Sequence, residues 1–134
     1  PYTTLFRSVR FRQQGWPLPD CISYTPVSDK RLQERGFNQA KLLAQQLAEA
    51  WQKPCVSLFQ SPQLVPHQIG LKRKERLANL KGKVQLQERP LPAHVTLVDD
   101  VITTGATLDY LSALLKAKGV QTVSVWTLAI TRAF

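Results

Sequence analysis

The residues best suited to chemistry lie together between positions 95 and 107, in the stretch VTLVDDVITTGAT. Asp99 and Asp100 follow a short apolar run that is typical of a buried strand. The small polar loop that comes next contains Thr103, Thr104, Gly105, Ala106 and Thr107. In open α/β sheets ligands bind at the carboxyl ends of the strands, so this stretch predicts a ligand site.

The threonine loop has the composition of a phosphate site. Successive backbone N–H groups at the start of a helix can converge on one point, and the helix dipole and threonine hydroxyls add to their attraction for an anion. Gly105 permits a close or left-handed backbone there. The competing interpretation is an ordinary strand-to-helix turn, in which the acids are a polar strand end and Thr104 or Thr107 caps the helix.

The two carboxylates indicate what else the ligand carries. Asp99 and Asp100 repel phosphate, so they must face another part of the ligand or a cation. Sugar hydroxyls are natural donors to carboxylates. We therefore expect a phosphorylated sugar, with its 5′-phosphate in the threonine loop and its 2′- and 3′-hydroxyls on the carboxylates. Magnesium, which takes few protein ligands, would be held by these hydroxyls and a second phosphate group.

The elements that must position these residues follow from the apolar pattern. Strands are predicted at 21–24, 55–59, 95–98 and 122–130, and residues 26–36 and 101–107 are predicted loops. One helix is predicted from Phe37, placed in the core, to just before Pro54, and another from Leu108 to a glycine cap at Gly119. Continuous apolar strands that alternate with helices predict an α/β fold, a parallel sheet flanked by helices on both faces.

Length and charge narrow the function classes. The chain has 134 residues, which suits one domain, and its 18 basic against 9 acidic residues give a net charge of +9. Such a surplus favours an anionic partner, and much of it lies in the run from Lys72 to Lys83. That run is open to three interpretations: a solvated face, a nucleic-acid surface, or a site for a phosphorylated small molecule.

Apolar runs, cysteines and the first residues indicate the cellular compartment and the domain boundaries. No apolar run approaches the roughly 18 to 20 residues that cross a bilayer, and no secretion signal begins the chain. Cys21 and Cys55 lack metal-ligand spacing, which predicts reduced thiols in a cytoplasmic protein without a structural zinc. Residues 1–8 fit no element and are expected to be an extraneous or processed end, which leaves 9–134 as the domain.

The stretch 95–107 resembles the signature of type I phosphoribosyltransferases that binds 5-phosphoribosyl 1-pyrophosphate (PRPP). The segments PVSDKRLQERGFNQAKLLAQQLA and IGLKRKERLANLKGKVQL further resemble the ComF/GntX branch of that superfamily, over about residues 20–131. This resemblance implies a type I phosphoribosyltransferase fold and an association with competence and the use of imported DNA. It also implies an N-terminal zinc-binding segment, whose absence here we expect to reflect truncation.

The resemblance implies a role for each candidate residue. PRPP would react with a nucleobase or another nitrogen nucleophile and release pyrophosphate, with Asp99 and Asp100 as the catalytic residues and Mg²⁺ bound through PRPP. The pyrophosphate is expected at Ser28, Asp29, Lys30 and Arg31. A flexible lid is expected to contain Arg73, Lys74 and Arg76. Arg35 and Asn38 are expected to brace the first loop rather than to touch the ligand.

The alternative is a binding protein that has this fold without transferase activity. The basic run together with Arg7, Arg10 and Arg12 would then contact the phosphates of single-stranded DNA. The basic run contains no aromatic residue for base stacking, which argues mildly against this alternative. Magnesium-bound PRPP and oligonucleotides are therefore the two ligand classes to compare.

Overall fold

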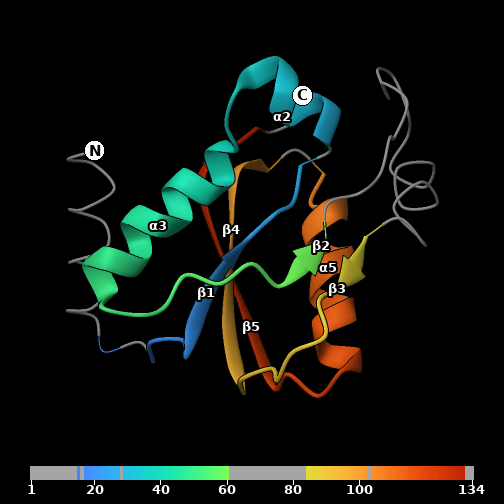
Figure 1. Ribbon diagram of the computed structural model, residues 1–134. Coiled ribbons are helices and arrows are strands. Elements are labelled where there is room, and N and C mark those ends of the chain that lie inside the picture. The colour runs from blue at the N-terminus through green and yellow to red at the C-terminus, as the bar shows by residue number, and fades with distance from the viewer. Residues whose placement is uncertain (1–14, 16, 28, 61–83, 103, 132–134) are drawn as a thin grey trace.

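The computed structural model describes residues 15, 17–27, 29–60, 84–102 and 104–131, and the structural statements below concern these residues. In chain order the elements are β1 (Cys21–Tyr24), α2 (Asp29–Arg35), α3 (Gln39–Trp51), β2 (Phe59–Gln60), β3 (Gln85–Leu86), β4 (His94–Ile102), α5 (Ala106–Ala117) and β5 (Thr122–Ile130). A parallel sheet with the strand order β1-β4-β5 forms the centre (Figure 1). The predicted parallel α/β architecture is thereby confirmed.

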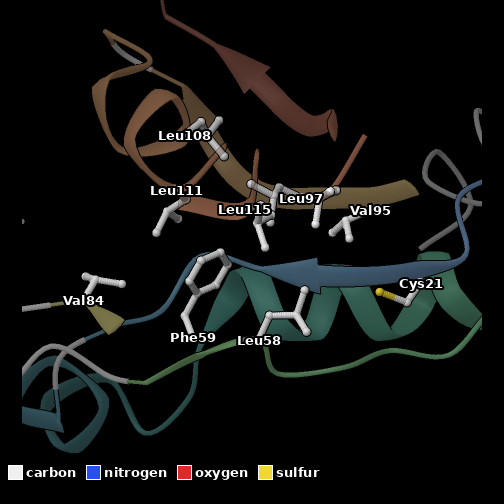
Figure 2. Close-up of a cluster of buried hydrophobic side chains, with 10 residues drawn as sticks. Cys21, Leu58, Phe59, Val84, Val95, Leu97, Leu108, Leu111 and Leu115 are labelled. Atoms are coloured by element: carbon white, nitrogen blue, oxygen red, sulfur yellow. The ribbon is translucent and has the colours of Figure 1, made fainter. Parts of the chain in front are cut away.

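Two amphipathic helices cover opposite faces of this sheet. α3 buries Trp51 in a cluster with Val98 of β4, and α5 buries Leu111 in a second cluster with Leu97. Because successive strand residues point to opposite faces, the neighbours Leu97 and Val98 serve different helices. Figure 2 shows the leucines of α5 gathered against Val95 and Leu97. Each large side chain buried in this way stabilises the fold by about 1.5–3 kcal/mol.

The ends of both helices follow local sequence signals. α3 ends at Trp51, where Gln52 takes a left-handed conformation (φ 54°), ahead of Pro54 as predicted. α5 ends in a basic turn followed by Gly119 at φ 100°, which confirms the predicted glycine stop. It begins at Ala106 rather than at Leu108, because the left-handed Gly105 already starts the helix.

The predicted loop at 26–36 is wrong in its second half, because α2 occupies Asp29–Arg35. Gly36, at φ 78°, ends this helix and donates its N–H to the Leu32 carbonyl at 2.7 Å. Phe37 follows this turn and is 45% exposed, so its predicted core position is also wrong. The apolar spacing failed here because α3 begins only after its cap Asn38, which leaves Phe37 outside the buried stripe.

The strand predicted at 55–59 is largely absent. Cys55 forms a single parallel bridge with Ile22, and the Val56 N–H donates to the Ile22 carbonyl at 2.8 Å. The Leu58 N–H turns instead to the Ser23 hydroxyl at 3.4 Å. A side chain thus takes the donor that a fourth strand would need, and the ladder beside β1 ends. β2 pairs antiparallel with β3 in a separate two-stranded sheet.

The central strand β4 is longer than the predicted 95–98. It continues to Ile102 because Val101 and Ile102 pair with Ala129 and Ile130 of β5. Asp99 and Asp100 are therefore the sixth and seventh of the nine residues of β4, inside the strand rather than at its end. The predicted loop 101–107 shrinks to the residues between Ile102 and Ala106.

Both cysteines are free thiols, as predicted. Cys21 lies in the cluster under α5, and Cys55 packs on the cluster under α3, so the sheet separates them. Burial raises the pKa of Cys21 to about 11 and also raises the pKa of Cys55, which keeps both thiols protonated and unreactive at neutral pH. In the part of the chain that the structure describes, no helix is both long and apolar enough to cross a membrane.

Candidate functional site

The carboxyl edge of the sheet brings together those singled-out residues that the structure describes in β4, in α2 and at the start of α5. β4 delivers Asp99 and Asp100 to this edge, and Gly105 at the start of α5 follows within a few residues (Figure 1). β1 ends at the same edge, since Tyr24 pairs in parallel with Val98. The candidate site is therefore built from one contiguous segment and from the chain that leaves β1.

Hydrogen bonds hold the Asp99 carboxylate on one of its two oxygens. The Asp100 N–H donates to Asp99 Oδ1 at 2.8 Å, and the Thr25 hydroxyl donates to the same oxygen at 3.2 Å. The Asp100 carboxylate in turn accepts from the Val101 N–H at 2.8 Å. These contacts fix both carboxylates next to the strand end, where a ligand can reach them.

The electrostatics of the pair point to a ligand rather than to a structural ion pair. Burial is the largest cause that raises the pKa of Asp99, to about 6, and the hydrogen bond and charge of the Asp100 carboxyl raise it as well. The Asp100 N–H and the Thr25 hydroxyl pull this pKa down and only partly compensate. A desolvated carboxylate beside a second carboxyl is relieved by hydroxyl donors or a cation, and a shift of this kind marks Asp99 as a candidate functional residue.

The turn into α5 has the backbone of an anion cradle. Gly105 sits at φ 76°, where β-branched residues are strained, and its carbonyl accepts the first helical bond from the Asp109 N–H at 2.9 Å. A Cβ at this position would meet nothing within 4 Å, so the space beside the turn is open. The N–H groups of the first helical turn have no acceptor inside the helix and can serve an anion.

The threonines of this turn differ in role. The Thr104 hydroxyl accepts the Ala106 N–H at 3.3 Å, so it takes up one of the donors of the turn. The alternative interpretation of Thr104 as a local cap therefore has support at this one atom. Thr107 is half-buried in the first turn of α5 and Ala106 is buried, while Thr103 lies outside the described residues.

The predicted pyrophosphate residues stand in a different setting from the expected loop. Asp29, Lys30 and Arg31 form the start of α2, which follows β1 at the same edge of the sheet (Figure 1). Arg31 is exposed, and Ser28 lies outside the described residues. Their role stays a prediction. The lid residues Arg73, Lys74 and Arg76 also lie outside the described residues, as do Arg7, Arg10 and Arg12.

The sequence analysis did not predict a role for Thr25, but it did predict one for Asn38. Asn38 was expected to brace the first loop, and its amide donates to the Thr25 carbonyl at 3.1 Å, which confirms this. Arg35 is exposed at the end of α2, and its bracing role stays a prediction. Thr25 could have been found from parallel register, because the residue after Tyr24 must lie beside the residue after Val98, which is Asp99.

The donor set also bears on the expected magnesium ion. The described residues contain no group of three or more His, Cys, Asp or Glu side chains that could hold a metal ion by themselves. Asp99 and Asp100 still supply hard oxygen ligands at a place where negative charge accumulates. Mg²⁺ usually takes one or two carboxylates and completes its shell with water and substrate phosphate. The two carboxylates therefore fit an ion that arrives with a phosphorylated ligand.

Comparison with curated proteins finds several clear relatives, although no family model matches the chain. The chain is 37% identical over 124 residues to DNA utilization protein YhgH of Salmonella typhi, a match that covers 90% of this chain and 53% of the relative. It is 42% identical over 118 residues to competence protein F of Haemophilus influenzae, covering 84% and 51%. Competence protein ComFC of Bacillus subtilis is 34% identical over 107 residues, covering 77% and 41%. The chain thus spans about half the length of the first two relatives.

Solved structures with the same fold are phosphoribosyltransferases. Orotate phosphoribosyltransferase from Aeropyrum pernix aligns with a TM-score of 0.57 and 16% identity, covering 96% of this chain and 58% of the other. A hypoxanthine phosphoribosyltransferase from Staphylococcus aureus aligns with a TM-score of 0.56 and 12% identity, covering 96% and 62%. At such identities the likeness establishes the fold alone.

Proposed function

Because the chain is homologous to competence protein F and the YhgH proteins and has the type I phosphoribosyltransferase fold, we propose that it binds PRPP with Mg²⁺. It then transfers the phosphoribosyl group to a nitrogen nucleophile, such as a nucleobase, and pyrophosphate leaves. The observation that carries this proposal is the Asp99–Asp100 pair, in which Asp99 is desolvated and only partly compensated by its hydrogen bonds, a few residues before the left-handed Gly105 turn.

Each part of PRPP has a matching part of the site. The 5′-phosphate binds the backbone N–H groups between Thr104 and Thr107, at the positive end of α5. The ribose hydroxyls donate to Asp99 and Asp100. The pyrophosphate extends toward the start of α2, which lies at the same edge of the sheet (Figure 1).

The reaction asks the protein to stabilise separating charges. The C1′–O bond to pyrophosphate breaks as a nitrogen forms the new bond at C1′, so positive charge grows on the ribose ring. Asp99 and Asp100 hold negative charge against the ring hydroxyls and favour this distribution. Bound Mg²⁺ would neutralise the pyrophosphate as it leaves. Arg31 in α2 can add positive charge near the pyrophosphate, and the basic residues at 72–83, which lie outside the described residues, are proposed to do the same.

The decisive experiment measures ligand binding and turnover separately. Magnesium-bound PRPP should raise the melting temperature, because a ligand that binds only the folded state stabilises it. Pyrophosphate release should follow with one member of a panel of nucleobases. Ribose 5-phosphate should bind more weakly than PRPP. If PRPP at millimolar concentration does not change the melting temperature, the proposal is overturned.

Single-stranded DNA binding is the second candidate. Its support is the net charge of +9 and the words "DNA utilization" and "competence" in the names of the relatives. The same thermal assay separates the two candidates. A DNA-only binder would be stabilised by an oligonucleotide, would ignore PRPP, and would lose affinity steeply as salt is added.

A further inference from the structure

Thr25 joins three elements of the site through its three polar groups. Its N–H donates to the Val98 carbonyl of β4 at 3.1 Å, and its carbonyl accepts from the Asn38 amide at 3.1 Å. Its hydroxyl donates to Asp99 Oδ1 at 3.2 Å. Thr25 is only 6% exposed, so its own polar groups are shielded from solvent. The residue is therefore a junction between β4, the start of α3 and the Asp99 carboxylate.

This junction determines which oxygen of Asp99 a ligand can use. Oδ1 already accepts from the Thr25 hydroxyl and from the Asp100 N–H, and a carboxylate oxygen has two lone-pair sites. Oδ2 is then the oxygen left for a ligand hydroxyl, which would replace the hydrogen bond between the Asp99 and Asp100 carboxyls. The two donors also prevent rotation of the carboxylate, so Oδ2 keeps one direction.

Asn38 ties the junction to a rigid part of the fold. Its Oδ1 accepts the Lys41 N–H at 3.3 Å and caps α3, while its amide group holds the Thr25 carbonyl. The helix that it caps buries Leu47 and Trp51 against the sheet. The hydrogen bond from Asn38 therefore anchors Thr25 to a packed helix. This matters because β1, the strand before Thr25, is only four residues long.

We propose that Thr25 and Asn38 are positioning residues that make Asp99 selective for a ribose with both vicinal hydroxyls. This inference rests on the proposed function and names the source of sugar recognition within it. A fixed Oδ2 accepts well from one sugar hydroxyl in one place. A carboxylate that can rotate accepts from water or from either hydroxyl and discriminates less.

The first test replaces the Thr25 hydroxyl. Calorimetry should compare ribose 5-phosphate with 2-deoxyribose 5-phosphate, which lacks one hydroxyl, in the wild type, Thr25→Val and Thr25→Ser. The wild type should prefer the ribose compound. Thr25→Val should reduce this preference about fivefold to tenfold, the usual worth of one hydrogen bond. Thr25→Ser keeps the hydroxyl and should keep the preference.

A matched control removes a different hydroxyl at the same edge. Thr127 lies opposite Asp99 on β5, and its hydroxyl donates to the backbone carbonyls of Asp100 and Ala129, at 3.2 and 3.0 Å. Thr127→Val should therefore leave the sugar preference unchanged. If it lowers the preference as much as Thr25→Val does, general disturbance of the edge explains the effect and the inference is overturned.

The second test separates helix capping from positioning. Asn38→Asp keeps an oxygen that caps α3 but loses the amide that holds the Thr25 carbonyl. Its melting temperature should stay near that of the wild type, while its sugar preference should fall. An unchanged preference in Asn38→Asp would overturn the role of Asn38. This variant and Thr25→Ser also decide the question if Thr25→Val does not fold.

The possible failures are distinguishable. If the wild type binds both sugar phosphates equally well, sugar recognition by the carboxylates is wrong, and the proposed function fails together with the inference. If the wild type discriminates and Thr25→Val discriminates equally, only the inference fails. Loss of preference in Thr25→Val, with rescue in Thr25→Ser, supports both.

Discussion

Two chain crossings meet at the carboxyl edge of the sheet, and they are built differently. β4 passes into α5 through residues 103–105, with a left-handed glycine at the last of them. β1 reaches α3 through residues 25–38, which include the separate helix α2. In the proposed site, the short crossing and the end of β4 offer backbone groups and carboxylates to the ligand, whereas the long crossing supports the Asp99 carboxylate through side chains. Chemistry and support thus come from separate parts of the chain.

This division predicts how substitutions in each crossing affect ligand binding. In the proposed site, changes in the short crossing or in the two acids before it remove groups that touch the ligand, so their effects on binding should be large. Changes in the long crossing alter only the orientation of such groups, and their effects should be several-fold, as described for Thr25 and Asn38. Variants of the short crossing, of the basic run and of Asp99 alone sharpen the comparison further.

The largest effect is expected when both carboxylates lose their charge. Asp99→Asn together with Asp100→Asn should reduce magnesium-dependent PRPP binding at least a hundredfold, because two charge-assisted contacts are lost. The fold should survive, since both residues are only partly buried and Asn has nearly the shape of Asp. Calorimetry measures the binding, and Glu49→Gln, an exposed change on α3, is the control. Undiminished affinity in the folded double variant would refute the ribose and metal roles.

A smaller effect is expected at the left-handed turn. Gly105→Val places a β-branched residue at φ 76° and should weaken ribose 5-phosphate and PRPP alike, roughly tenfold, because both share the phosphate cradle. The cause is backbone strain rather than a clash, since the space beside Gly105 is open. Gly105→Asn, which tolerates the left-handed region, should bind nearly as the wild type does. Loss of PRPP binding alone would show that the phosphate lies elsewhere.

The same division explains what could be predicted from the sequence. The short crossing is contiguous, so the acids, the glycine and the helix after them are visible within thirteen residues. The long crossing depends on capping and on contacts distant in the sequence, such as Thr25 with Asp99. α2 has little apolar periodicity because it buries no stripe, and Phe37 fits the spacing of a helix that begins two residues later. Neither fact could be read from local pattern alone.

The basic run tests the two candidate functions. Replacing Arg73, Lys74 and Arg76 with Ala should weaken PRPP binding or turnover several-fold and leave ribose 5-phosphate nearly unaffected, if these residues cover the pyrophosphate. The salt dependence of single-stranded DNA binding provides the comparison, because each lost phosphate contact flattens the slope by roughly 0.7. Unchanged PRPP behaviour with a flattened slope would favour the DNA-binding function.

The smallest effect concerns stability and follows from the burial of Asp99. Its folded pKa of about 6 lies above its ordinary value of 3.8, so the unfolded state gives up this proton more easily. The favourable contribution of protonated Asp99 is complete below about pH 4 and is lost as the pH rises through 6. Asp99→Asn does not titrate there. Without ligand it should be more stable than the wild type at pH 7 by on the order of 1 kcal/mol, after allowance for solvent screening.

Melting curves of both proteins between pH 4 and pH 8 measure this difference in stability. Titration of the groups that the two proteins share cancels in the comparison. A gap that widens with pH by roughly 2–5 °C is expected for a domain of this size. Magnesium-bound PRPP should then reverse the order, because only the wild type gains from hydroxyl donors on the Asp99 carboxylate. The same carboxylate would thus weaken the empty fold and strengthen the liganded one, as expected for a group kept for binding. A gap that stays constant with pH would mean that Asp99 is not desolvated, and the electrostatic argument for the site would fall with it.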